Sequence, residues 1–181
     1  MKPSSFFLRA VRRALFAVAV AGAASFIAPT SASAQSPEQI RAIFLFNFAK
    51  NVEWPASAFA DGKSPIVVGV VRAHDVADAL ERSVRGKDAN GREITVQRID
   101  RVEEASACHI VFIGRADKTA EFIAGLQGKP VLTVAEEEKF TEEGGMIKLF
   151  TDGNKVGCFV NVTASTSAGL QLSSKLVASK N

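Results

Sequence analysis

The sequence predicts a single-domain α/β protein with a layered fold: a mostly parallel central sheet, helices on both faces and a C-terminal antiparallel hairpin. Three apolar runs, at residues 66–71, 110–113 and 131–134, are nearly continuous. Continuous runs of this length are typical of strands that are buried on both faces of a parallel sheet. Helical segments at 75–84 and 117–126 separate them. Because strands and helices alternate, we expect right-handed crossovers between the parallel strands.

The first 34 residues have the pattern of a secretory signal peptide. They contain four basic residues and no acidic one, followed by an apolar stretch at 14–28 and by Ala32-Ser33-Ala34. The small residues suit cleavage before Gln35. A membrane anchor is the alternative, but an apolar stretch of about 15 residues is shorter than the roughly 20 that span a bilayer. We therefore expect residues 1–34 to be removed on export, and residues 35–181 to form one domain in the periplasm.

The charge balance points away from nucleic acid as a partner. The whole chain has 22 Lys and Arg residues against 19 Asp and Glu residues. Four of the basic residues lie in the first 34, so the remainder carries 18 basic and 19 acidic groups. A domain without excess positive charge lacks the electrostatic signature of nucleic-acid binding. Its apolar content and two cysteines also exclude the disordered and disulfide-dense classes.

The domain is expected to begin with a helix. Ser36 can cap it, Pro37 suits its first position, and Gln39 can reach back to the cap. The helix should reach about residue 52 and end before Trp54. Its polar residues scatter around the axis and phenylalanines fill the rest, so we expect other elements to cover it on more than one side.

Between the two helical segments, an alternating strand is expected at 94–98. The last third of the chain changes character, with two strands at 146–150 and 155–162 that are separated by a short polar turn that contains glycine. Strands joined in this way pair as an antiparallel hairpin. The spacing of leucines then predicts a final helix over 164–178.

The two histidines do not form a recognisable catalytic set. His74 lies beside Asp75 at a predicted strand end, where α/β folds place functional groups, so a hydrolase that uses His74 is one hypothesis. The alternative is a solvent-facing histidine before an Asp that caps a helix. His109 follows Cys108 at the start of a buried strand, and neighbouring strand residues point to opposite faces. The two residues therefore cannot easily share a metal ion.

No metal or other cofactor is expected. The cysteines and histidines lack the spacing of a zinc site. Gly69, Gly144 and Gly145 lack the strand, loop and helix context of a phosphate-binding loop. The glutamates at 136–138 and 142–143 are expected in a short helix and at its end, as a solvated face without the alternating ligands of a calcium loop.

The two cysteines have two alternative fates. In an oxidising compartment Cys108 and Cys158 could form a disulfide. Alternatively, each packs in or beside a strand as a small apolar residue. A bridge requires the two Cα atoms to come within about 7 Å, and the order of the strands decides this.

Four groups of residues occur in a characteristic order: 42–50 followed by Glu53-Trp54-Pro55, then 108–114, 144–147 and 159–161. In this order and spacing they resemble the YfiR-like family of periplasmic regulatory proteins, over nearly all of residues 38–178. The positions that match the family motifs are Asn47, Phe48, Trp54, Pro55, His109, Gly144, Gly145 and Asn161.

The resemblance implies a single α/β domain that acts by protein contact and is not an enzyme. The best-known member represses an inner-membrane diguanylate cyclase, and thus cyclic-di-GMP signalling, through the periplasmic part of that enzyme. An outer-membrane lipoprotein releases it. That member uses disulfides, and a two-bridge arrangement cannot be carried over to a chain with two cysteines.

Three hypotheses for function follow. The first is a regulatory binding protein whose partner is the periplasmic domain of a diguanylate cyclase or another sensor, or a second copy of the chain. Phe44, Phe46 and Trp54 are then candidate anchors, and the alternative is that the first helix is simply core. The second is a small-ligand receptor with a pocket at the carboxyl ends of the strands, near His74 and Gly114. The third is the hydrolase that uses His74.

Overall fold

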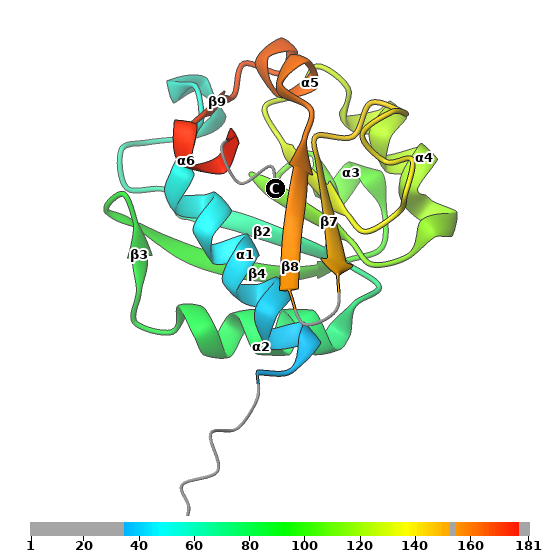
Figure 1. Ribbon diagram of the computed structural model, residues 1–181. Helices are drawn as coiled ribbons and strands as arrows, with labels where there is room; N and C mark the ends of the chain where they lie inside the picture. The colour runs from blue at the N-terminus through cyan, green and yellow to red at the C-terminus, as the bar shows by residue number, and fades with distance from the viewer. Residues whose placement is uncertain (1–34, 153–154, 178–181) are drawn as a thin grey trace, which may run out of the picture. The chain divides into compact units, whose positions relative to one another are not determined.

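A seven-stranded sheet lies at the centre of the computed structural model, which describes residues 35–152 and 155–177 (Figure 1). The chain divides into two units, residues 1–33 and 34–181, and the expected signal peptide lies outside the described residues. Along the chain the elements are α1 (Pro37–Asn51), β1 (Val52–Glu53), η1 (Ala56–Ala58), β2 (Ile66–Val71), α2 (His74–Val84), β3 (Asp88–Ala89), β4 (Arg92–Ile99), α3 (Val102–Ala105), β5 (Ile110–Ile113), α4 (Ala116–Leu126), β6 (Leu132–Ala135), β7 (Ile147–Asp152), β8 (Lys155–Val160), α5 (Val162–Ser167), β9 (Gln171–Leu172) and α6 (Ser174–Val177).

The strand order is β3-β4-β2-β5-β6-β7-β8. The five strands from β4 to β7 are parallel, and the sheet ends at each side in an antiparallel pair, β3 with β4 and β7 with β8. The registers of the central strands place Val68 opposite Ile110, and Ile110 opposite Leu132. The predicted α/β class, with a mostly parallel sheet and a C-terminal hairpin, is confirmed.

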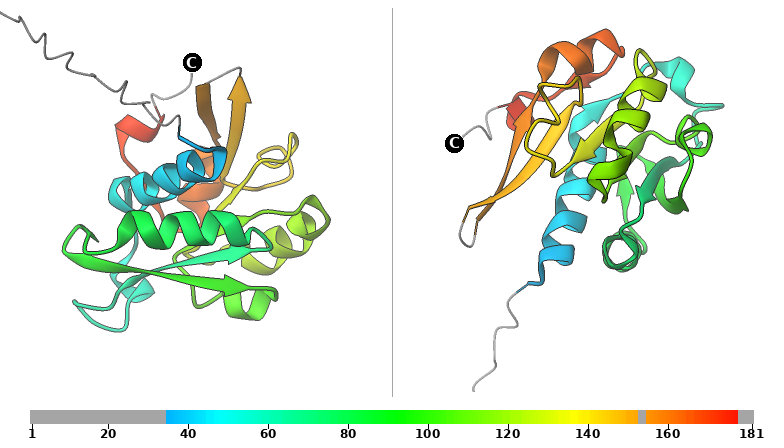
Figure 2. Two further views of the ribbon diagram at one scale, coloured as in Figure 1. Left: turned by 90° about the horizontal axis from the view of Figure 1, so that it is seen from below. Right: turned by 90° about the vertical axis from the view of Figure 1, so that its right-hand side faces the viewer.

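The sheet separates two layers of helices. On β5, Ile110 and Phe112 pack into one apolar cluster with α1 and α2, whereas Val111 and Ile113 pack into a second cluster with α3 and α4. The left view of Figure 2 shows α1 and α2 on one side of the strands and α3 on the other. Both faces of the central strands are therefore buried, which explains why their sequences are apolar without alternation.

The first helix begins and ends as its sequence predicts. The Ser36 N–H donates to Gln39 Oε1 at 2.9 Å, and the Gln39 N–H donates to Ser36 Oγ at 3.3 Å, which completes a capping box. The helix packs against α2, β3, β5 and α6. It is thus covered on more than one side, as the scattered polar residues indicate.

The predicted final helix is wrong. The chain instead forms α5, a turn, the short strand β9 that pairs with β1, and α6. Gly169 has a φ of +75°, a left-handed conformation that glycine adopts without strain and that ends a helix. Leu170 then becomes buried and Leu172 lies in β9, so the leucine spacing reflects packing of an irregular segment.

Smaller differences from the sequence prediction concern the ends of elements, and the strand expected at 94–98 covers Arg92–Ile99. The third apolar strand covers Leu132–Ala135, one residue later than expected. The hairpin strands are Ile147–Asp152 and Lys155–Val160, and the chain turns away at Asn161 into α5. The acidic segment at 136–143 forms successive turns and no helix. Glu136 in this segment pairs with Arg41 of α1, a long-range contact that local sequence does not reveal.

The structure contradicts the alternative of a disulfide between Cys108 and Cys158, because both cysteines are free and buried. Cys108 belongs to the cluster with α3 and α4, and Cys158 to the cluster on the opposite face of the sheet. Their strands are also separated by β6 and β7. With neighbouring strands about 4.8 Å apart, this spacing exceeds the roughly 7 Å that a disulfide allows.

We predict that the native thiols react slowly. Burial, with the nearby charge of Glu104, raises the pKa of Cys108 to about 11, and burial raises the pKa of Cys158. Because the thiolate is the reactive species, both groups should resist a disulfide reagent such as DTNB at neutral pH. Denaturing the protein without reductant should release two thiols for each chain. Finding no thiol under these conditions would show a bridge and contradict the structure.

Candidate functional site

The imidazole of His109 joins three segments at the amino ends of β2 and β5. Its Nδ1 accepts the N–H of Val67 at 3.0 Å, and its Nε2 lies 3.1 Å from the carbonyl oxygen of Ala58. The backbone N–H of His109 also donates to the Val67 carbonyl at 2.8 Å. Since Nδ1 accepts a hydrogen bond, it carries no proton, and the neutral tautomer donates from Nε2 to Ala58.

Aromatic rings surround this imidazole. Phe59 stacks on it at a centroid distance of 4.4 Å, and Trp54 meets it edge-on at 6.0 Å. The indole N–H of Trp54 donates to the His109 carbonyl at 3.2 Å. The Arg92 guanidinium lies 3.7 Å from the centre of the Phe59 ring, and donates to the Ser64 carbonyl at 2.6 Å. We call Trp54, Phe59, Arg92 and His109 the aromatic cluster.

Sequence reasoning identified only two members of the aromatic cluster. Phe59 was detectable as a lone large apolar residue in a segment of small and polar residues, from 56 to 64. Arg92 gave no such signal, because a basic residue at a strand start is common on any surface. Pro55 lies outside the aromatic cluster but helps to position Ala58, which His109 contacts. The Pro55 carbonyl accepts the N–H of Ala58 at 2.9 Å.

The environment of His109 keeps it neutral. Burial lowers the pKa of His109, and the positive charge of Arg92 lowers it further, while the bond to Ala58 acts in the opposite direction. Protonation at Nδ1 would also break the bond from Val67. The ring therefore acts as a fixed hydrogen-bonding connector between loop and sheet.

A second group of motif positions holds the acidic segment against the hairpin. Gly144 has a φ of +104°, and a Cβ on Gly145 would lie 2.5 Å from the Phe140 ring. Asn161 accepts the N–H of Ala164 at 3.0 Å, which caps α5, and donates from Nδ2 to the Thr141 carbonyl at 2.9 Å. The fold therefore explains why glycine occurs at 144 and 145 and asparagine at 161.

The exposed side of α1 carries a different set of residues. Phe48 is fully buried, whereas Phe46 is half-buried, with the ammonium groups of Lys50 and Lys87 at 5.5 and 5.4 Å from its ring centre. Asn47 is exposed, and its side chain makes no hydrogen bond within the described part of the chain. Phe44 is half-buried and packs against Phe48 at 6.0 Å. Asn47 and Lys50 are exposed one turn apart, and the half-buried Phe46 lies one turn before Lys50.

A cavity of about 420 Å³ opens at the carboxyl ends of β2 and β5. The chain crosses from β2 to β4 on one side of β2, and then returns to β5 on the other side of β2. The strand order therefore reverses between β2 and β5. His74 and Gly114 line the cavity, as expected. A Cβ on Gly114 would lie 2.5 Å from that of Ala73, so only glycine permits the two strand ends to approach.

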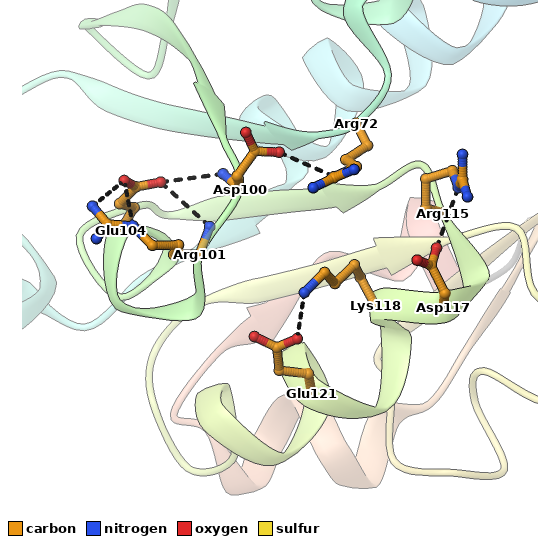
Figure 3. A network of polar contacts seen from close by, with 8 residues as sticks. All are labelled: Arg72, Asp100, Arg101, Glu104, Arg115, Asp117, Lys118 and Glu121. Carbon is orange, nitrogen blue, oxygen red and sulfur yellow. Dashed lines mark hydrogen bonds and ion pairs between the residues drawn. The ribbon is translucent and has the colours of Figure 1, made fainter.

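Paired charges line this cavity and its surroundings. Arg41 forms a two-bond contact with Glu136, with Nε to Oε1 at 2.6 Å and Nη2 to Oε2 at 3.0 Å, and this carboxylate raises the pKa of Arg41. Arg72 pairs with Asp100 at 3.2 Å. Figure 3 shows this pair within a wider polar network on the loops and helix starts beyond the strand ends.

His74 lines the cavity but lacks a partner that would orient it. Its side chain is exposed, and no hydrogen bond joins its ring to another residue of 35–152 or 155–177. A general base in a hydrolase is normally held by a third group. The structure therefore gives the hydrolase hypothesis no support from geometry.

Within residues 35–152 and 155–177, no three His, Cys, Asp or Glu side chains gather in a way that could hold a metal ion. No helix there is both long and apolar enough to cross a membrane.

We predict that the neutral state of His109 makes the protein less stable in mild acid. Between its lowered folded pKa and the unfolded value near 6.5, the unfolded chain binds more protons, so the free energy of unfolding rises with pH in this window. Urea unfolding at pH 7.5 and 5.5 should show this loss on acidification. His109→Gln should reduce the pH dependence, whereas the exposed control His74→Gln should keep it. An unchanged dependence in His109→Gln would contradict the assignment.

The comparisons with known proteins identify the family of the chain. None of the curated proteins compared with the chain matches it. The model of one family, described as YfiR/HmsC-like, matches residues 38–178, which is most of the chain and nearly all of the described structure. Members of this family are periplasmic regulators and have a regulatory, non-catalytic role. The chain therefore belongs to the YfiR/HmsC-like family.

Proposed function

We propose that the protein is a non-enzymatic periplasmic regulator that binds the periplasmic part of an inner-membrane signalling enzyme and represses it. A diguanylate cyclase is the first candidate for that enzyme, and an outer-membrane lipoprotein is a candidate for the partner that relieves repression. Family membership supports the regulatory class, and the signal-peptide pattern of residues 1–34 supports export.

The observation that carries this proposal is the surface at the C-terminal half of α1. Asn47 is a motif position whose side chain has no role in the fold. This side chain is exposed and makes no hydrogen bond in the described structure. Beside it, Phe46 offers an aromatic face, and Lys50 and Lys87 place positive charge around it. An aromatic residue with a charged rim is a common form of interface anchor. We call Phe46, Asn47, Lys50 and Lys87 the α1 surface.

Trp54, another candidate anchor, is better explained as part of the core. Its indole N–H is already bonded to the His109 carbonyl, and its ring packs against the large apolar cluster. A partner could use it only by breaking these contacts. We therefore propose the exposed side of α1, and not its end, as the partner surface.

We predict that substitutions on the α1 surface mainly affect partner capture, whereas a substitution at Trp54 mainly affects stability. Asn47→Ala should lose capture of the sensor's periplasmic domain while keeping the melting temperature within a few degrees, because this side chain is exposed. Phe46→Ala should also lose capture, with a smaller loss of stability than Trp54→Ala, because its half-buried ring packs at the edge of the core. Trp54→Ala should instead lower the free energy of unfolding by about 2–4 kcal/mol through lost packing and one lost hydrogen bond. Pulldown and thermal unfolding of the same preparations measure both effects.

Charge reversal provides a matched control for this experiment. Lys87→Glu lies on the α1 surface and should weaken capture, whereas Lys129→Glu makes the same charge change beyond α4, on the opposite face of the sheet, and should not. Equal losses from both changes, or full capture by Phe46→Ala, would contradict the proposed surface.

A small-ligand receptor is the second candidate function, because the cavity lies where the strand order reverses. Open α/β sheets bind ligands at such points. Its lining includes Arg41, Arg72 and His74 together with Glu38, Asp75 and Glu136, so it suits a small polar ligand that can satisfy groups of both signs.

We predict that, if the receptor function holds, a thermal-shift screen with small polar metabolites will raise the melting temperature. A ligand at 100 times its dissociation constant stabilises the folded state by about 2.7 kcal/mol. His74→Ala and Arg72→Ala should reduce the shift, and the control Arg115→Ala, outside the cavity lining, should not. Under the regulatory proposal alone, His74→Ala leaves sensor capture unchanged and no metabolite shifts the melting temperature.

A further inference from the structure

A second cavity, of about 460 Å³, lies between α4, β6 and the segment at 143–146 that leads into β7. The right view of Figure 2 shows α4 beside this segment. None of the residues that line this cavity also lines the one at the carboxyl ends of β2 and β5. The two cavities are therefore separate sites with different chemistry.

The side of the cavity formed by α4 is aliphatic. Ala120 and Ala124 are exposed one turn apart, and Ile123 and Leu126 line the same side. Met146 lines the cavity from the start of β7. No aromatic ring belongs to the lining in the described part of the chain. Such walls stabilise an aliphatic body by removing it from water, but they offer no ring on which an aromatic ligand could stack.

The opposite wall is held in place by the fold. Gly144 has a φ of +104°, and a Cβ on it would lie 3.5 Å from Cγ2 of Ile123, so the segment passes close to α4. The Phe140 ring fills the space beside Gly145, whose N–H donates to the Phe140 carbonyl at 2.8 Å. Because this wall is already ordered, a ligand does not have to pay for ordering it.

Glu143 carries the only charge in the described lining of this cavity. Its side chain is exposed, and its carboxylate has no hydrogen bond or ion pair with residues 35–152 or 155–177. No lysine or arginine lines the cavity beside it. The electrostatic interaction therefore favours a cationic ligand and disfavours an anionic one.

Thr133 places an unused hydrogen-bond donor in the lining. Its side chain is 3% exposed, and its Oγ1 accepts the N–H of Met146 at 3.1 Å. A threonine hydroxyl also has a proton to donate, and that proton has no acceptor among the described residues. Since a buried donor without an acceptor is unfavourable, a neutral oxygen on a ligand would stabilise this group.

We propose that this cavity binds a small aliphatic amine that carries a neutral oxygen acceptor. The ammonium group of the ligand pairs with Glu143, its carbon chain packs against the aliphatic side of α4, and its oxygen accepts the hydroxyl proton of Thr133. A ligand with a carboxylate or phosphate group fits poorly, because the only charge in the lining is negative.

Four six-carbon compounds with terminal functional groups test each part of this site: aminohexanol, hexylamine, hexanediol and hydroxyhexanoate. Titrations followed by the methyl NMR signals of Ile123 and Met146 report binding in the cavity. Aminohexanol should bind about fivefold more tightly than hexanediol, the effect of one exposed ion pair, and about fivefold more tightly than hexylamine, the effect of one hydrogen bond. Hydroxyhexanoate should bind most weakly. Equal affinity of aminohexanol and any other compound, or no shift of these methyl signals, would overturn the proposal.

Two neighbouring glutamates provide a matched control for the ion pair. Glu143→Gln should weaken aminohexanol about fivefold and leave hexanediol unchanged. Glu142→Gln makes the same charge change at an exposed residue outside the cavity lining, and should leave both affinities unchanged. Equal effects of the two substitutions on aminohexanol would contradict the assignment of the ammonium group to Glu143.

A substitution that fills the cavity tests the location of binding. Ala124→Leu adds volume at an exposed helix position that tolerates leucine, so the melting temperature should be kept while binding of aminohexanol is lost. Arg72→Ala, in the lining of the other cavity, should keep binding. Binding that survives Ala124→Leu and disappears in Arg72→Ala would assign the compound to the other cavity and overturn the proposal.

Discussion

The neutral imidazole of His109 is the interaction on which the amino end of the sheet depends. Three separate requirements meet at this ring: the N–H of Val67 needs an acceptor, the carbonyl of Ala58 needs a donor, and the ring of Phe59 needs a flat surface. A neutral histidine supplies a donor, an acceptor and an aromatic face within one small ring. Because an unpaired buried backbone group costs about 1–3 kcal/mol, the loss of this ring would affect loop and strand at the same time.

The two ends of the parallel strands therefore have different characters. At the amino end, ring contacts and backbone hydrogen bonds join Trp54, Phe59 and His109 and cover the ends of the strands. At the carboxyl end, the reversal of strand order separates the loops that follow β2 and β5, and a cavity remains between them. The cavity of the proposed receptor function thus lies at the carboxyl end, while the rings at the amino end hold loop and sheet together.

Sequence patterns predicted those features that local physics determines. The capping box at Ser36 fixed the start of α1, and the continuous apolar run at β2 reflected burial on both faces. The final helix failed because leucine spacing cannot show that Gly169 turns the chain into the left-handed region. Likewise, the contacts of His109 with Ala58 and Phe59 depend on the order of the strands and on loop closure, and neither leaves a local pattern.

The structural tasks of the motif residues limit what family membership can say about a partner. Phe48, His109, Gly145 and Asn161 have structural roles, so their presence bears on the architecture and does not select a partner. A particular sensor must be selected by side chains that the fold does not need, because a residue with a structural task cannot change with the partner. On α1, that condition is met by Phe46 and Lys50 beside Asn47. Under the proposed function, partner specificity therefore belongs to the surface of a helix whose other faces are committed to the core.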